Sequence, residues 1–181
     1  MSKIITISGS AQHGKDTCAT YMREYLMSKN KNVMIIHFAD VLKFVAKQWY
    51  GWDGVKDEHG RTILQYLGTD VFRKNRPDCW ATIVKELILG MGDTVDFVIE
   101  PDCRFPNEII AMREIDPTKV CSIKVVRPNF DNGLTEEQKG HISETALNNW
   151  KFDYIIDNSG DAESLRNKVI EICNIFLIGE Y

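Results

Sequence analysis

The chain has 181 residues, of which 44% are hydrophobic and 27% charged, and its 22 basic and 26 acidic side chains give a net charge of −4. This size favours one domain whose core needs no disulfide or metal, and the composition excludes intrinsic disorder. The acidic balance argues against a general nucleic-acid-binding protein. No apolar run approaches the roughly 20 residues that span a bilayer.

The N-terminus and the cysteines indicate the compartment. The first residues lack the pattern of a secretory signal. The cysteines are scattered, without a Cys-x-x-Cys pair, and are Cys18, Cys79, Cys103, Cys121 and Cys173. We therefore expect reduced core thiols in a cytoplasmic protein, with neither a membrane nor a nucleic acid as partner.

Apolar runs that favour strands alternate with stretches of helical periodicity along the whole chain. In chain order the sequence predicts a strand at 4–8, a helix at 15–28, a strand at 33–38, a helix at 40–49, a loop at 51–60, helices at 61–73 and 78–91, a strand at 95–99, a helix at 107–114, a strand at 120–126, a loop at 129–140, a strand at 154–157 and a last helix after Asp161. This order predicts an α/β fold with a five-stranded, mostly parallel sheet and helices on both faces. Ligands of such sheets bind at the carboxyl ends of the strands.

The first strand runs into a phosphate-binding motif. Residues 9–15 match G-x-x-x-x-G-K between a strand and a helix. Glycines let successive N–H groups face phosphate oxygens, and Lys15 brings an ammonium to the β- and γ-phosphates. For His13 we expect the backbone N–H, rather than the imidazole, to matter. The predicted phosphate-binding residues here are Gly9, Ala11, Gln12, His13, Gly14, Lys15, Asp16 and Thr17.

Asp16 departs from the common motif, which has Ser or Thr after the lysine. Its carboxylate could hold Mg²⁺, directly or through water, or could only favour the helix N-terminus. Thr17 could hydrogen-bond a phosphate instead.

The third strand is followed by Asp102 and Arg104. Asp102 is a second candidate for organising Mg²⁺, or else an ion-pair partner of Arg104 or Lys15. Guanidinium groups bind phosphate bidentately, so Arg104 and Arg61 are candidates for gripping a monophosphate acceptor. The alternative for both is a solvated surface arginine, and Lys43 has the same two interpretations.

Other candidates have a structural alternative of equal weight. Trp80, Tyr66 and Phe38 could stack on a base or belong to the core. Arg127, after the fourth strand, could contact ATP phosphates. Asn158, after the fifth strand, could lie near adenine or be a turn residue. We expect His37 to be a core residue, and Arg73 and Arg76 to be solvent-facing or salt-bridged.

The motif Gly14-Lys15-Asp16-Thr17 resembles the phosphate loop of the bacteriophage deoxynucleoside monophosphate kinases. Further motifs match that family in the same order along nearly the whole chain. They are Phe38-Ala39-Asp40-x-x-Lys43, Arg61-x-x-x-Gln65-x-Leu67-Gly68-Thr69-Asp70, Trp80, Asp102-x-Arg104 with Glu108, Val125-Val126-Arg127-Pro128, His141-x-Ser143-Glu144 and Asp157-Asn158. The chain is shorter than some members between Lys43 and Arg61.

The resemblance implies a single P-loop kinase domain over residues 1–181, with an acceptor-binding helical insertion at about 40–92 and a short lid at about 127–150. It implies transfer of a phosphoryl group from ATP, with Mg²⁺, to deoxynucleoside 5′-monophosphates, with Lys15, Arg104 and Asp102 as the catalytic residues. The implied acceptor-binding residues are Phe38, Ala39, Lys43, Arg61, Gln65, Gly68, Thr69, Trp80, Asp102, Arg104 and Glu108. Arg127 and Asn158 would bind ATP, and Asp16 and Asp102 are the candidate Mg²⁺ ligands.

Two alternative functions stay open from the sequence. The chain could be another small-molecule P-loop kinase, such as one acting on dephospho-coenzyme A or phosphomevalonate, or a nucleotide-binding switch without enzymatic activity. The oligomeric state is open as well, and a homodimer is one possibility. If the protein is phage-encoded, it would act in the host cytoplasm.

Overall fold

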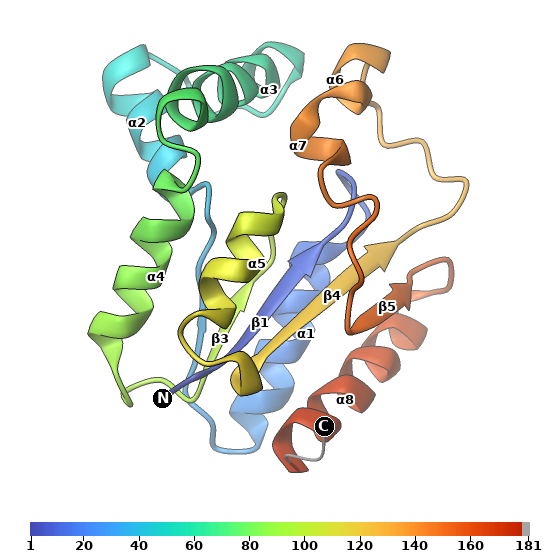
Figure 1. Cartoon of the computed structure of the whole chain (residues 1–181). Helices are drawn as coiled ribbons and strands as arrows, with labels where there is room; N and C mark the ends of the chain where they lie inside the picture. Colours follow the sequence, from blue (N-terminus) through green and yellow to red (C-terminus); the bar gives the residue numbers. More distant parts are fainter. Residues whose placement is uncertain (179–181) are drawn as a thin grey trace.

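The computed structural model describes residues 1–178. Strands and helices alternate along the chain as the sequence predicts (Figure 1). The elements are β1 (Lys3–Ser8), α1 (Lys15–Ser28), β2 (Val33–Ile35), α2 (Asp40–Tyr50), α3 (Glu58–Gln65), the π-helix η1 (Tyr66–Arg73), α4 (Cys79–Met91), β3 (Phe97–Glu100), α5 (Pro106–Arg113), the 3₁₀ helix η2 (Pro117–Lys119), β4 (Val120–Val126), α6 (Glu136–Gly140), α7 (Ile142–Thr145), β5 (Tyr154–Asp157) and α8 (Ala162–Ile178).

The sheet has five strands in the order β2-β3-β1-β4-β5. Every neighbouring pair is parallel, and β1 lies at the centre with Ile5 opposite Ile99 on one side and Cys121 on the other. Strand β1 is almost wholly buried, as expected for a central parallel strand covered on both faces. The predicted α/β fold is confirmed.

Helices cover both faces of the sheet (Figure 1). On one face, α1 and α8 pack their apolar side chains, such as Met22 and Val169, against Ile5 and Ile123. On the other face, α4 and α5 form a second cluster, in which Val84 meets Val98. All the strands point their carboxyl ends the same way, so the loops that follow them meet along one edge.

Two groups of helices stand over this edge (Figure 1). Helices α2 and α3 with η1 lie on one side and share a separate apolar cluster with the start of α4, built around Leu42, Trp52, Leu67 and Trp80. Helices α6 and α7 lie on the other side. No helix within residues 1–178 is both long and apolar enough to cross a membrane.

The structure changes several predicted boundaries. The strand predicted at 33–38 ends at Ile35, and beyond it the N–H groups of Phe38 and Ala39 bond to Asp102 instead of a neighbouring strand. The strand predicted at 95–99 is Phe97–Glu100, and the helix predicted at 61–73 is divided into α3 and η1. The helix predicted from residue 61 begins at Glu58, since the Asp57 side chain caps it by accepting from Gly60 N at 2.7 Å. The predicted loop at 129–140 ends in the short helix α6.

Candidate active site

The phosphate loop joins β1 to α1 and has the backbone that its glycines allow. Gly9 and Gly14 have φ of 147° and 96°, and a side chain at Gly9 would collide with the Val125 carbonyl of β4. Gln12 also has a positive φ, of 61°. The sequence of strand, glycine turn and helix N-terminus is the geometry that binds phosphate through backbone N–H groups.

The Lys15 ammonium lies inside this loop. Its Nζ donates to the carbonyl oxygens of Gly9 and Ser10, at 2.8 Å each, and the side chain is buried. Burial and, after it, the nearby positive charge of Arg104 lower the pKa of Lys15 to about 8. The negative charge of a bound phosphate would oppose this shift by stabilising the charged ammonium, so this lysine is prepared for an anionic ligand.

The imidazole of His13 fastens the loop to the segment after β4. Its Nδ1 accepts a hydrogen bond from Arg127 N at 3.1 Å, while its own backbone N–H is directed to the Ser10 carbonyl. Burial and the charge of Lys15 lower the pKa of His13, which favours the neutral ring that this bond requires. The imidazole of His13 thus has a structural role that the sequence did not indicate, beside the phosphate-binding role predicted for its backbone N–H.

Asn158 and Gln12 make further links to the loop. Asn158 Nδ2 donates to the His13 carbonyl at 2.9 Å, and Gln12 Nε2 donates to the Asn132 carbonyl at 3.0 Å. The Arg127 guanidinium lies 4.1 Å from the centre of the Phe130 ring. These contacts bring the predicted donor-side residues together at the carboxyl ends of β4 and β5.

Asp102, which follows β3, holds the start of α2. Its two carboxylate oxygens accept from Phe38 N at 2.8 Å and Ala39 N at 3.1 Å. Both oxygens are therefore engaged with backbone, and Asp102 supports the turn that leads into α2. The Phe38 ring is buried in the core, so Phe38 and Ala39 meet Asp102 through their backbone N–H groups.

His37 connects the phosphate loop to α2, which the sequence did not reveal. Its Nδ1 lies 3.2 Å from Asp40 Oδ2 and its Nε2 lies 3.5 Å from Asp16 Oδ1. The bond to Asp16 raises the pKa of His37. Asp40 also pairs with Lys43 at 2.9 Å, so the expected core histidine is instead a link between charged groups.

The donor set around the loop fits a magnesium ion only in part. The Asp16 carboxylate is 83% exposed beside Lys15 and can reach a ligand. Within residues 1–178 there is no cluster of three or more His, Cys, Asp or Glu side chains that could hold a metal by itself. Magnesium in kinases is held by one or two carboxylates together with substrate phosphates and water. Asp16 suits that arrangement, and the engaged oxygens of Asp102 suit it less.

Arg104 reaches from the end of β3 to the opposite group of helices. Its guanidinium pairs with the Glu144 carboxylate and contacts the Ser143 carbonyl, both in α7. Glu144 is close enough to influence Lys15 as well, since its charge raises the pKa of that lysine. A carboxylate of the predicted lid thus lies among the cations expected to bind phosphate.

Glu108 is a buried hub beneath Arg104. One oxygen pairs with the Arg73 guanidinium, and the other accepts from Arg104 N at 2.6 Å and Phe105 N at 2.9 Å. Burial raises the pKa of Glu108 despite the Arg73 charge. A side chain only 1% exposed cannot touch an acceptor, so Glu108 positions Arg104, and Arg73 is salt-bridged.

Trp80 belongs to the apolar cluster that α2, α3 and η1 share with the start of α4. It is 4% exposed, its Nε1 donates to the Gly68 carbonyl at 3.1 Å, and its ring centre lies 5.0 Å from that of Phe72. Gly68 is itself packed under Leu42. Stacking of Trp80 on a base, one of its two predicted roles, does not fit this placement, because only 4% of the side chain is exposed.

The remaining acceptor candidates line α3 and η1. Arg61, Gln65 and Thr69 are half-buried, one to two helical turns apart, whereas Tyr66 is 57% exposed. The loop before α3 adds Lys56, whose charged neighbours include Asp16 and Arg61. The sequence analysis missed this lysine because it stands in a polar loop without a motif.

The thiols take no part in the site. All five cysteines are free; Cys18, Cys103, Cys121 and Cys173 are buried, and Cys79 is half-buried. Burial raises the pKa of Cys18 to about 12, so its thiol stays protonated beside the phosphate loop.

Solved structures share this architecture. The APS kinase CysC of Mycobacterium tuberculosis, in complex with AMPPNP and APS, superposes with a TM-score of 0.54 at 10% identity over 96% of this chain and 98% of that chain. A structure named APE1195 gives a TM-score of 0.52 at 11% identity over 98% and 96% of the two chains. These likenesses show the fold, and the phosphate loop that follows β1 makes it a P-loop fold.

A match to a protein-family model identifies the family to which the chain belongs. The model described as deoxynucleotide monophosphate kinase matches residues 28–169, and the chain belongs to that family. No curated protein sequence matches the chain. The family and the fold make the protein a nucleotide kinase.

Proposed function

We propose that this protein transfers the γ-phosphoryl group of ATP to deoxynucleoside 5′-monophosphates. The observation that carries the proposal is the placement of Lys15 in the phosphate loop, within electrostatic reach of Arg104 at the end of β3. The acceptor helices, with Arg61 and Lys43, stand over the same edge of the sheet. Donor and acceptor phosphates would meet between these cations.

The chain's own residues need to supply charge and position rather than a nucleophile. An oxygen of the acceptor phosphate attacks the γ-phosphorus in line while the bond to the β-phosphate oxygen breaks. Lys15 and Arg104 stabilise the charge that spreads over the transferred group. Magnesium, when bound with ATP beside Asp16, would neutralise charge on the β- and γ-phosphates.

Arg104 must exchange partners to act in this way. In the structure its guanidinium is held by Glu144 of α7, and a phosphate has to displace that carboxylate. Like charges repel, so the arrival of a phosphate near Lys15 also disfavours Glu144 at its present place. Helix α7 therefore responds to the state of the site, as expected of a lid that excludes water.

The test is a coupled ADP-release assay with ATP and magnesium. The acceptors are the four deoxynucleoside monophosphates, the matching ribonucleotides, dephospho-coenzyme A and phosphomevalonate. We expect turnover with at least one deoxynucleotide and none with the last two. Turnover confined to dephospho-coenzyme A or phosphomevalonate would overturn the proposed substrate class and leave the fold unaffected.

Two substitutions test which arginines bind the acceptor phosphate. Arg61→Lys and Arg104→Lys keep the charge and lose the fork that binds phosphate bidentately. We expect each to raise the acceptor KM far more than the KM for ATP. A selective rise in the KM for ATP would move the residue concerned to the donor side.

A further inference from the structure

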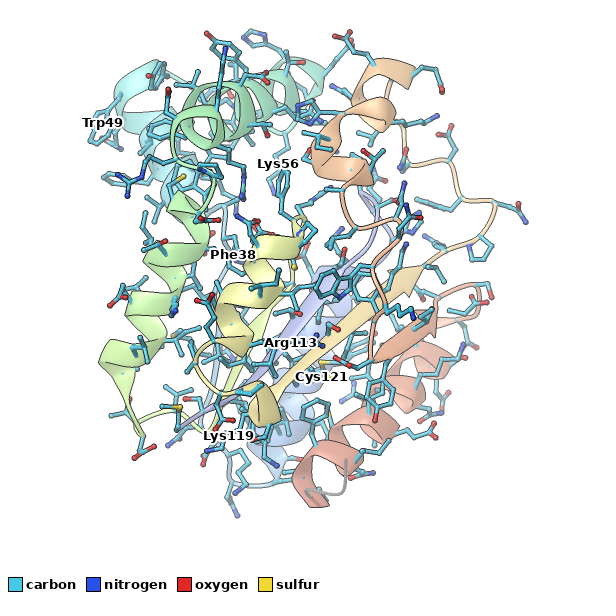
Figure 2. The ribbon with its side chains drawn as sticks, in the orientation of Figure 1. Phe38, Trp49, Lys56, Arg113, Lys119 and Cys121 are labelled. Atoms are coloured by element: carbon cyan, nitrogen blue, oxygen red, sulfur yellow. The ribbon has the colours of Figure 1, made fainter. Side chains whose placement is uncertain are left out.

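Lys56 projects from the loop between α2 and α3 toward the space beneath the helices. Figure 2 shows it between the acceptor helices and the lid helix α7. It precedes Asp57, which caps the helix that carries Arg61. No motif in the sequence includes Lys56.

The backbone on both sides of Lys56 is firmly held. On the N-terminal side, the buried Trp52 donates its indole N–H to the Val55 carbonyl at 3.0 Å. On the C-terminal side, Asp57 caps α3 through Gly60 N at 2.7 Å. Gly60 packs so closely under the Val55 carbonyl that a side chain there would collide with it. The loop thus presents Lys56 from a fixed base, which reduces the ordering that a ligand must impose.

The charges around the Lys56 ammonium come from both halves of the site. They are Lys43 and Arg61 of the acceptor helices, Asp16 of the phosphate-loop helix and Asp102 after β3. Partial burial lowers the pKa of Lys56, and Lys43 lowers it further. Asp16 and Asp102 already contact His37 and backbone N–H groups. Within the described residues, the Lys56 ammonium has no hydrogen-bond or ion-pair partner.

We infer that Lys56 binds the phosphate of the acceptor nucleotide on the side that faces the phosphate loop. This inference rests on the proposed function and adds a residue to its acceptor site. Lys43 and Arg61 lie near enough for their charges to act on Lys56, and a nucleoside monophosphate would bring two negative charges to these cations. The ammonium is a compact point charge on a flexible stem, so it can follow the acceptor oxygen as phosphoryl transfer proceeds.

Binding and turnover are measured on three variants. Lys56→Gln removes the charge, Lys56→Arg restores it, and Lys29→Gln is the control. Lys29 follows the far end of α1, about 20 Å along the helix from Lys15. Isothermal titration with each deoxynucleoside monophosphate, without ATP, gives the acceptor Kd, and the coupled assay gives kcat and KM. Thermal unfolding of each variant verifies its fold.

We expect Lys56→Gln to weaken acceptor binding about tenfold or more, as the loss of a charged hydrogen bond does. Lys56→Arg should recover part of the affinity, and the KM for ATP should stay within about twofold. Lys29→Gln should match the wild type in every measurement.

The outcomes separate this inference from the proposed function. Wild-type affinity in a folded Lys56→Gln variant overturns the role of Lys56, even if the enzyme turns over deoxynucleotides. A wild type that binds deoxynucleotides without turnover refutes the proposed function, while weaker binding by Lys56→Gln still supports the inference. A wild type that binds none of the four overturns both.

Discussion

Replacing Glu108 by alanine tests the hub beneath Arg104. The side chain is 1% exposed, and its two oxygens hold Arg73 and the N–H groups of Arg104 and Phe105. The substitution leaves the Arg73 guanidinium, which is 11% exposed and lies 4.0 Å from the Phe105 ring centre, without its counter-charge. It also frees the backbone that carries Arg104.

The expected magnitude follows from burial. Removing one partner of a buried ion pair costs about 3–5 kcal/mol, because the other charge stays desolvated and unpaired. Glu114, at the C-terminal end of the same helix α5, is the control: it pairs with Lys85 at 2.7 Å and is 59% exposed. Exposed pairs contribute about 0–1 kcal/mol, so Glu114→Ala should change stability by no more than that.

Urea denaturation of both variants measures the free energies of unfolding, and the coupled assay measures the acceptor KM. We expect Glu108→Ala to be the less stable by at least about 2 kcal/mol, by the difference between these ranges, and to raise the acceptor KM. Equal stability losses in the two variants would refute the argument from burial. A destabilised variant with an unchanged acceptor KM would refute the link from Glu108 to Arg104.

Three further predictions concern the phosphate loop and the apolar cluster around Trp80. Lys15→Ala should stay folded by circular dichroism and lose phosphoryl transfer about a thousandfold; near-normal turnover would contradict the phosphate-loop assignment. Trp80→Ala should lose about 3–5 kcal/mol in urea denaturation, because it empties a buried site, whereas a selective rise in acceptor KM at unchanged stability would favour base stacking. The lowered pKa of His13 stabilises the protein above pH 6.5, and this contribution is lost as pH falls through the folded pKa. His13→Asn keeps an acceptor for Arg127 N, so its thermal stability should fall less than that of the wild type from about pH 7 to about pH 5; parallel curves would exclude this role.

Local patterns predicted the frame of the molecule. The phosphate loop was predictable because its glycines and Lys15 lie within seven residues and act through their own backbone. The strands were predictable because buried parallel strands are continuously apolar, as in β1. The early end of β2 was not, since it depends on Asp102, which lies more than 60 residues further along the chain.

Pairings between side chains that lie far apart in the sequence could not be predicted from local patterns. Arg104 and Glu144 lie 40 residues apart, and Arg73 and Glu108 lie 35 apart. Each charged residue had several candidate partners in the sequence, and only the folded arrangement of these elements selects one. The same limit applies to Trp80, whose spacing suits both a core residue and a base-stacking residue until the Gly68 carbonyl is found beside it.

The order of the strands determines when the phosphate loop can form during synthesis. β1 emerges from the ribosome before its two neighbours, β3 and β4, which lie about 90 and 115 residues later in the chain. At about 5–20 residues per second, the first strand waits on the order of ten seconds for its partners. Gly9 also packs against the Val125 carbonyl near the end of β4. The nascent chain therefore completes this loop only after Val125 has been made, and ATP bound to the loop cannot assist an earlier stage of folding.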